Sequence, residues 1–307
     1  MNNYRYTLQR KGSKLDCPAC GKKKRFVPYI DTATGQPIHR TVGKCDRESN
    51  CGYHLTPSEY FKSNNIKPKY TNFVPKPEPP KPMGLLPADL VSQSESMQSN
   101  FVAFLSTLFP DGAIVQNVCN KYRIGATKQR EVIFWQVDEH NRVRSGKIMQ
   151  YNPETGKRSK TQPANWVHSK MIKAGKLNAD FNLTQCFFGQ HLLNNNPSAT
   201  VAIVESEKTA TIASVLMPKF IWLAAGQLHG LNIEKCSCLS GRNVMLFPDL
   251  SAKKENRMRA FEIWSAKATE IMKTYKCKVI VSDILEKNSC ETERANGLDI
   301  AYYLING

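Results

Sequence analysis

The sequence predicts an α/β protein, with a mostly parallel sheet in its C-terminal third and a small cysteine-rich module at its N-terminus. Three observations predict this organisation. Apolar runs alternate with amphipathic stretches from Thr200 onward, four cysteines fall within residues 17–51, and seven prolines fall within residues 67–87. We therefore divide the chain into a ribbon-like module (1–66), a proline-rich linker (67–88), a basic α+β middle segment (89–197) and a sheet domain (198–307).

The chain is strongly basic, and its charge is concentrated near the N-terminus. Its 307 residues have a formal net charge of +17, and residues 1–82 carry 16 Lys and Arg against 6 Asp and Glu. A large positive excess favours polyanionic partners, most often nucleic acid. No apolar run approaches the roughly 18 residues that cross a bilayer, and the first residues are polar. We expect a cytoplasmic protein with no membrane partner.

The four N-terminal cysteines have the spacing of a metal-binding ribbon. Cys17-Pro-Ala-Cys20 is followed by a glycine, and Cys45 and Cys51 form a second, wider pair, also followed by a glycine. We expect strands at 25–30 and 38–42 with a turn at 32–36 between them, which is the layout of a zinc ribbon. The predicted structural zinc ligands are Cys17, Cys20, Cys45 and Cys51; the wide second pair leaves open that His39 or His54 replaces one thiolate. A basic run directly after the first pair would then lie on a rigid surface and contact phosphates: Lys22, Lys23, Lys24 and Arg25.

The middle of the chain combines a linker with an α+β pattern. A short capped helix is expected at 56–61, and the following prolines favour an extended spacer. Apolar spacing predicts a helix over 101–109, and short β-rich runs predict strands at 131–137 and 142–151. Four cations there are candidates for nucleic-acid contact: Lys147, Lys157, Arg158 and Lys160. Their proximity in sequence to Trp135, Tyr151 and Trp166 fits either a base-stacking surface or a half-buried sheet with a charged outer face.

The C-terminal region reads as a sheet of parallel strands covered by helices. Strands are predicted at 200–204, 220–224, 242–247 and 278–281, and helices at 208–217, 254–276 and 298–304. In such sheets, ligands bind outside the carboxyl ends of the strands. Glu205, Asp249 and Asp283 follow three of these strands, and Asp299 precedes the last helix. We expect these carboxylates to converge and to bind Mg²⁺, a hard ion that prefers oxygen ligands.

These motifs resemble those of the Toprim domain, a Rossmann-like fold, as it occurs in primases. Val201-Ala-Ile-Val-Glu205-Ser-Glu207-Lys208 resembles the first Toprim motif, and Val244-Met-Leu-Phe-Pro-Asp249 the strand that leads into its Asp-x-Asp motif. Gly297-Leu-Asp299 resembles the closing acidic stretch, and Cys186-Phe-Phe-Gly189 the end of the basic segment before Toprim. The chain as a whole resembles Toprim-containing primase-like proteins of Bacteroides-type mobile genetic elements.

The resemblance implies roles for particular residues. Glu205 would act in acid/base catalysis, and Asp249 would be the first Mg²⁺ ligand. Lys208 is a further candidate for nucleic-acid contact, and the sequence leaves open whether it contacts phosphate or pairs with Glu205. The chain departs from the family pattern at Ser251, where the second Asp is expected, and at Ser206, where glycine is expected.

The resemblance also implies function and partners. It implies a DNA replication protein that binds single-stranded DNA or a DNA/RNA hybrid and acts as a primase-type nucleotidyltransferase beside a separate helicase, because the chain has no phosphate-loop motif of its own. Two alternatives stay open: a non-catalytic DNA-binding accessory factor for mobile-element replication or transfer, which Ser251 favours, and, third, a Toprim nuclease.

Overall fold

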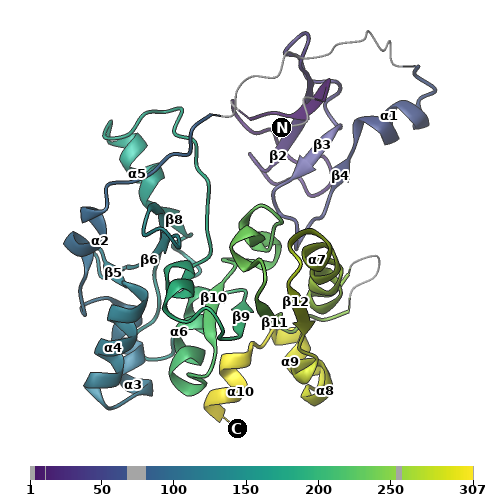
Figure 1. Cartoon of the computed structure of the whole chain (residues 1–307). Helices are drawn as coiled ribbons and strands as arrows, with labels where there is room; N and C mark the ends of the chain where they lie inside the picture. The colour runs from purple at the N-terminus through teal and green to yellow at the C-terminus, as the bar shows by residue number, and fades with distance from the viewer. Residues whose placement is uncertain (1–3, 11, 68–80, 254–257, 307) are drawn as a thin grey trace. The chain divides into compact units, whose positions relative to one another are not determined.

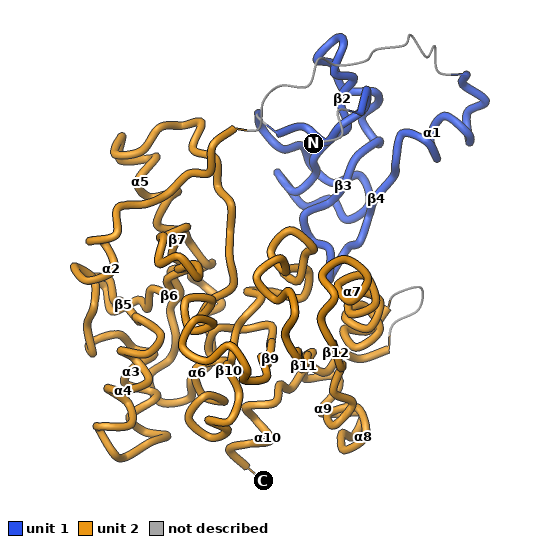
Figure 2. The backbone as a smooth tube through the Cα atoms, viewed as in Figure 1, with its two compact units in different colours: residues 1–80 blue, residues 81–307 orange. Residues whose placement is uncertain are grey.

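The computed structural model describes residues 4–10, 12–67, 81–253 and 258–306, which form two compact units, residues 1–80 and 81–307 (Figure 2). Most of the predicted linker, residues 68–80, lies outside the described residues, as do residues 254–257 at the start of the last long predicted helix. No helix in the described ranges combines the length and the apolar character that crossing a bilayer requires.

The smaller unit is an antiparallel sheet followed by one helix. Its strand order is β1-β2-β3-β4, with bounds Tyr6–Leu8, Phe26–Asp31, Gly43–Cys45 and His54–Leu55. Helix α1 (Pro57–Ser63) begins at a capping box, in which Thr56 and Glu59 satisfy each other's backbone N–H groups, so the predicted capped helix is confirmed.

One predicted strand of this unit is wrong. The strand expected at 38–42 forms instead at Gly43–Cys45. The His39 ring bonds to the Thr41 hydroxyl at 2.7 Å and the Val42 N–H donates to the His39 carbonyl, so these residues form a turn. Such local bonds compete with the regular pairing of a strand.

The first half of the larger unit is built on a second antiparallel sheet, in the order β5-β6-β7-β8. Strands β6 (Val132–Val137) and β7 (Val143–Met149) confirm the two predicted strands, and α3 (Asn100–Leu108) confirms the predicted helix. The remaining elements here were not predicted: α2 (Asp89–Ser94), α4 (Gly112–Tyr122), β5 (Gly125–Ala126), β8 (Asn165–Trp166), α5 (Val167–Lys173) and the 3-10 helix η1 (Gln190–Asn195).

The second half contains the predicted parallel sheet. Its order is β10-β9-β11-β12, every neighbouring pair is parallel, and the bounds are Ile221–Ala224, Val201–Val204, Asn243–Phe247 and Lys278–Val281. Figure 1 shows this sheet among its helices, namely α6 (Glu207–Leu216), α7 (Ala260–Tyr275), α8 (Ile284–Asn288), α9 (Glu291–Asn296) and α10 (Ile300–Asn306), with two 3-10 turns, η2 (Leu228–Gly230) and η3 (Lys235–Leu239). Central strand β9 is buried along its whole length, as expected for a strand covered on both faces.

The two sheets of the larger unit share one hydrophobic core. Val132 and Phe134 on one face of β6 belong to the same apolar cluster as the strands of the parallel sheet. The buried Tyr122 hydroxyl of α4 donates to the carbonyl of Trp222 on β10 at 2.9 Å. The opposite face of β6 carries Ile133 and Trp135 into a second cluster with Leu86 and Val91.

Both faces of β6 are therefore covered. Trp135 and Tyr151 are core residues, 2% and 5% exposed, so the base-stacking interpretation is wrong for these two side chains.

Candidate functional site

The four N-terminal cysteines gather at one point of the smaller unit. Their sulfur atoms lie within 4.8 Å of one another, and they are the one group of three or more such side chains found among the described residues. Two Sγ atoms, those of Cys17 and Cys51, are 3.8 Å apart. A tetrahedral zinc ion with Zn–S bonds of about 2.3 Å places its ligands about 3.8 Å apart, so the cluster fits zinc.

Backbone turns present these sulfurs. Gly21 and Gly52, which directly follow Cys20 and Cys51, both have φ +65°, the left-handed conformation that lets the chain turn back sharply. The backbone N–H of Lys22 donates to the Cys20 thiolate and lowers the pKa of that thiol to about 6. Amide donors of this kind stabilise the thiolate form that a metal requires.

Neither histidine that was considered as an alternative ligand belongs to the cluster. The His54 ring is stacked on Tyr29 and bonded to its hydroxyl at 3.0 Å. His39 is stacked on Tyr60 and bonded to Thr41. Among the described residues, the cluster therefore consists of the four cysteines alone.

The acidic residues of the larger unit meet at the carboxyl ends of two adjacent strands. Glu205 directly follows β9, and Asp249 lies two residues beyond the end of β11. Because β9 and β11 are parallel neighbours with Val204 opposite Phe247, the two acids come together although 44 residues separate them in sequence. The backbone N–H of Asp249 donates to Oε1 of Glu205 at 3.2 Å.

Asp299 joins this pair from the loop before α10. The Leu250 N–H donates to the carbonyl of Leu298 at 2.9 Å, which brings the loop alongside the end of β11. The Asp299 carboxylate accepts from the Thr209 hydroxyl at 2.5 Å and from the Tyr302 N–H at 3.0 Å. Thr209 was not singled out from the sequence, and its place on the first turn of α6, beside the acidic motif, is the one signal that points to it.

Burial and mutual repulsion hold two of these acids toward their protonated forms. Desolvation, reinforced by the charge of Asp299, raises the pKa of Glu205 to about 7. Desolvation followed by the charges of Glu205 and Asp299 raises the pKa of Asp249 well above its ordinary value, while Lys208 acts in the opposite direction. The Oδ1 atom of Asp249 is buried, and no described residue forms a hydrogen bond with it. A divalent cation would take that oxygen as a ligand and neutralise the excess negative charge.

The residues present suit Mg²⁺ in a particular way. The carboxylate oxygens of Glu205, Asp249 and Asp299 do not form a group within 4.8 Å of one another in the described chain. Mg²⁺ commonly uses one or two carboxylates, with waters and substrate phosphates completing its octahedron. Glu205 and Asp249 would hold the ion, and Asp299 would contribute charge from beside it.

Asp283 lies apart from this acidic site. It is the residue before α8, its side chain is 52% exposed, and its carboxylate forms an ion pair with Lys287 at 2.8 Å. It is not among the charges that act on Glu205 or Asp249. The predicted convergence therefore includes three of the four acids, and Asp283 acts as a surface residue of its own helix.

Both serines that depart from the Toprim pattern have defined roles in the fold. The Ser251 hydroxyl accepts from the N–H of Ala260 at 2.8 Å and so satisfies the first residue of α7. Ser206 is the N-cap of α6, and its hydroxyl accepts from the Thr209 N–H at 3.1 Å. Each serine satisfies a helix N-terminus and adds no charge to the acidic site.

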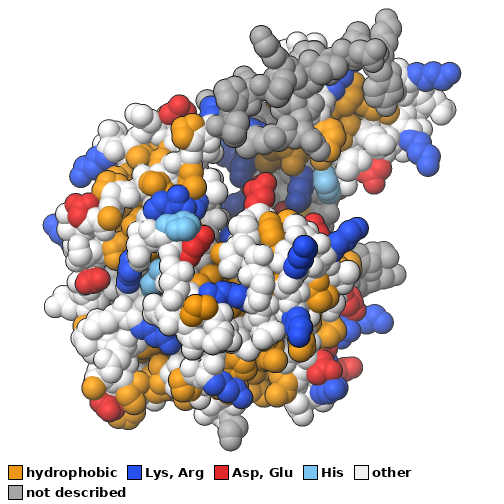
Figure 3. Space-filling view, in the orientation of Figure 1, with side chains coloured by type: hydrophobic (Ala, Val, Ile, Leu, Met, Phe, Trp, Pro, Cys, Tyr) orange, Lys and Arg blue, Asp and Glu red, His pale blue; other side chains and the backbone are white. Residues whose placement is uncertain are grey.

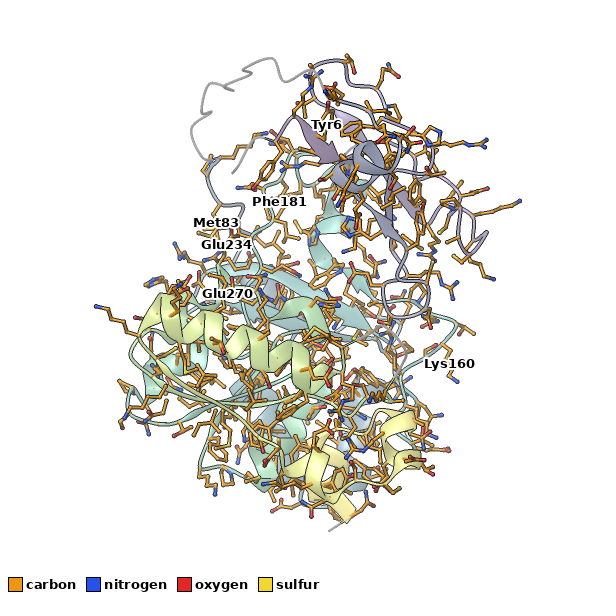
Figure 4. All side chains as sticks on the ribbon, turned by 90° about the vertical axis from the view of Figure 1, so that its right-hand side faces the viewer. Tyr6, Met83, Lys160, Phe181, Glu234 and Glu270 are labelled. Carbon is orange, nitrogen blue, oxygen red and sulfur yellow. The ribbon has the colours of Figure 1, made fainter. Side chains whose placement is uncertain are left out.

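The predicted nucleic-acid contacts fall into two groups. Lys147 is buried, and its ammonium forms an ion pair with Glu207, which is also buried and which no local sequence pattern marks as buried. The three predicted cations of the loop after β7 are exposed, as is the basic run of the smaller unit: Lys157, Arg158, Lys160, Lys22, Lys23, Lys24 and Arg25. Lys160, labelled in Figure 4, lies at the periphery of the larger unit.

Exposed cations of the larger unit can be seen on one face of the molecule. On the face drawn in Figure 3, Lys and Arg side chains are scattered over the larger unit. Lys208 is partly exposed and lines a pocket of about 240 Å³ together with Asp299, Phe104 and Tyr302. This pocket adjoins the acidic site, because Asp299 belongs to both.

Two family models match parts of the chain. Residues 99–250 match a model described as a domain of unknown function (DUF6371), and residues 4–66 match a model of a zinc beta-ribbon finger. The second match covers the four clustered cysteines. No curated protein matches the chain.

Several solved structures of primases are similar to the chain at low identity. The primase fragment of the bacteriophage T7 primase-helicase protein is 13% identical with a TM-score of 0.37, covering 88% of this chain and 89% of that one. The DnaG catalytic core is 10% identical with a TM-score of 0.41, covering 71% and 81%. The Aquifex aeolicus primase, with its zinc-binding and RNA polymerase domains, is 12% identical with a TM-score of 0.38, covering 98% and 80%.

Proposed function

We propose that this chain is a primase-like protein that binds single-stranded DNA and transfers nucleotides at a Mg²⁺-dependent Toprim-type site. The observation that carries the proposal is the meeting of Glu205 and Asp249 at adjacent strand ends, with a 3.2 Å hydrogen bond between them. The first Toprim motif and the strand before Asp249 resemble those of primases at these same positions.

The geometry suits phosphoryl transfer in which the 3′-hydroxyl of one nucleotide attacks the α-phosphate of the next and pyrophosphate leaves. The bound Mg²⁺ would neutralise charge on the attacking and leaving oxygens. Glu205, to which the Toprim resemblance gives the acid/base role, would accept the hydroxyl proton. Asp249 would hold the ion, and Lys208 would attract the phosphates toward the site.

The smaller unit would contact the template. Its four cysteines would bind a structural zinc ion, and the exposed run Lys22 to Arg25 would follow the phosphates of the strand. Similar contacts are proposed for Lys157, Arg158 and Lys160 on the larger unit. A separate helicase would supply the unwound strand.

The test is template-dependent ribonucleotide incorporation with Mg²⁺ or Mn²⁺. We expect Glu205→Gln and Asp249→Asn each to reduce incorporation by about 10²-fold or more, the lower end of the range for a lost acid/base group. Asp283→Asn is the matched control, since its carboxylate is exposed and paired elsewhere, and it should leave the rate unchanged. Undiminished activity in both Glu205→Gln and Asp249→Asn refutes the assigned site.

A second function, a non-catalytic DNA-binding accessory factor, is favoured by Ser251. Its hydroxyl already accepts from Ala260 and contributes no charge where the Toprim pattern has a second Asp. In Ser251→Asp the new carboxylate would still accept that N–H and would add an anionic ligand, so Mn²⁺ affinity should rise. If neither the native chain nor Ser251→Asp incorporates nucleotides while both bind DNA, the accessory role is selected. Shortened template in the same reactions would indicate the nuclease.

A further inference from the structure

A buried ion pair lies next to the acidic site, because one of its partners is two residues after Glu205. Lys147 on β7 and Glu207 at the start of α6 have side chains 10% and 2% exposed. The Lys147 ammonium donates to both carboxylate oxygens, at 2.9 and 3.1 Å, and to the carbonyl of Gly226 at 2.8 Å. An ammonium has three hydrogens, so all of its donors are used inside the protein.

The Gly226 end of this arrangement leads to Glu205. The Gly226 N–H donates to the carbonyl of Glu205 at 2.8 Å, and the neighbouring Ala225 N–H donates to Val204 at 2.9 Å. Glu207, the other partner of Lys147, is two residues after Glu205. Lys147 thus binds two groups next to Glu205. One is the carbonyl of Gly226, whose N–H bonds to Glu205, and the other is the side chain of Glu207.

The surrounding structure restricts how Lys147, Glu207 and the Gly226 backbone can be arranged. Gly226 has φ +92°, a backbone conformation that glycine adopts readily and other residues rarely. A second buried lysine, Lys235, donates to the carbonyl of Ala225 at 3.1 Å. Because buried charges are costly unless they are paired, one geometry of Lys147 and Glu207 is strongly preferred.

We propose that Lys147 and Glu207 are positioning residues, which fix the backbone of Glu205 and so set the direction of its carboxylate toward the bound cation. The pair links the antiparallel sheet that carries Lys147 to the catalytic end of the parallel sheet. Glu207 therefore does not bind the metal, although it belongs to the same acidic motif. The role in cation binding rests on the proposed function, whereas the fixing of the Glu205 backbone does not.

The first measurement is amide hydrogen exchange at Gly226, which reports the bond to Glu205 without any metal. In Lys147→Met/Glu207→Met both charges are removed together, which buried pairs tolerate better than the loss of one partner. We expect exchange at Gly226 to become at least 10-fold faster in this double variant. Lys147→Arg in the native chain keeps the charge and the donors, so it should retain most of the protection of the Gly226 amide.

Arg144→Met is the matched control. Arg144 is also buried on β7 and forms an ion pair with a buried acid, Asp138, which keeps a second partner in Arg142. This variant loses an internal charge on the same strand without a bond to Gly226. Its Gly226 amide should exchange within about threefold of the native rate.

The second measurement is the Mn²⁺ dissociation constant, which we expect to rise at least 10-fold in the double variant and to change little in Arg144→Met. The proposal is overturned if the folded double variant exchanges its Gly226 amide at the native rate. It is also overturned if that amide exchanges faster while the variant binds Mn²⁺ as tightly as the native chain does. If the native chain binds no Mn²⁺ but Gly226 exchanges faster in the double variant, the metal site fails and the backbone role of the pair stands.

Discussion

The carboxyl group of Asp249 is held in a setting where every large influence but one disfavours its charge. Burial and the two neighbouring acids raise its pKa, and only Lys208 lowers it. Among the described residues, no donor reaches its Oδ1 atom. A buried acceptor of this kind calls for an explanation, and the cation that we propose would supply one.

Glu205 gives this site a pH signature in metal-free protein. Its pKa is about 7 when folded and near its ordinary value of 4.5 when unfolded. Below pH 4.5 both states are protonated and burial carries no penalty; between pH 4.5 and 7 the unfolded state ionises first, so stability falls as pH rises. We expect Glu205→Gln to match the native chain in free energy of unfolding near pH 4 and to exceed it by about 3 kcal/mol at pH 8.

Denaturant titrations in EDTA check this expectation. Asp283→Asn should show the opposite trend, because Lys287 lowers the pKa of Asp283 and makes its charge stabilising at neutral pH. A native chain whose stability advantage over Glu205→Gln grew with pH would contradict the assigned environment. Added Mg²⁺ should restore native stability above pH 7, since the ion binds only the folded state.

Individual site residues differed in how well sequence predicted them. Glu205 and Asp249 were predictable because each follows an apolar run that forms a parallel strand. The pairing of Lys147 with Glu207 was not predictable, because 60 residues separate the two and the pair forms only when two different sheets pack together. A lysine in a charged stretch looks exposed in sequence, and only the packing shows that it is buried.

At the scale of elements, the turn after β7 shows how a glycine allows close packing. In residues 152–156 the Asn152 side chain accepts from the N–H groups of Glu154 and Thr155. Gly156 has φ +61°, and a Cβ atom there would lie 2.4 Å from the ring of Phe104. The turn therefore lies directly against α3, and its Thr155 forms a wall of the pocket beside Asp299.

Gly156→Ala should destabilise the larger unit through both strain and overlap. We expect a loss of about 2–3 kcal/mol in the free energy of unfolding, combining a left-handed alanine with overpacking against Phe104. Gly175→Ala is the matched control, since Gly175 has φ +69° and no atom near its missing Cβ. Chemical denaturation should show a loss of about 1 kcal/mol there; equal losses at the two positions would contradict the close approach of Phe104.

The smaller unit has strands of only two to six residues, so its cysteine cluster must supply much of its stability. We expect one zinc ion per chain by elemental analysis, and loss of that zinc in Cys17→Ser together with rapid proteolysis within residues 4–66. Cys290→Ser is the control, because Cys290 is exposed and lies outside the cluster. A zinc-free native chain that resists protease equally well would rule out the metal as the source of stability.

Elements with strong periodicity were predicted well, and short ones were not. The four parallel strands and α3 were visible as apolar runs bounded by turn residues. Strands β4, β5 and β8 have two residues each and carry no period of their own. Their pairing depends on neighbours supplied by distant parts of the chain, which no local pattern reports.

For the whole molecule, the excess of positive charge should dominate how it binds DNA. We expect affinity for a single-stranded oligonucleotide to fall steeply with salt, and the slope of log affinity against log salt to decrease by up to about 3 when Lys22, Lys23, Lys24 and Arg25 are all changed to Gln. Changing four other exposed lysines, Lys173, Lys176, Lys273 and Lys278, alters net charge equally and should leave most of the slope. Indistinguishable slopes for the two quadruple variants would remove the basic run from the DNA contact.

The single core that joins the two sheets of the larger unit has a practical consequence for dissecting this protein. A recombinant fragment cut between residues 197 and 198 would strip Tyr122 from the carbonyl of Trp222 and leave the apolar side of β10 facing water. Such a fragment should aggregate, whereas residues 81–307 expressed alone should yield monodisperse material. A fragment that starts at the motif boundary would therefore lack half of its core. A fragment meant to contain the acidic site must also include the antiparallel sheet.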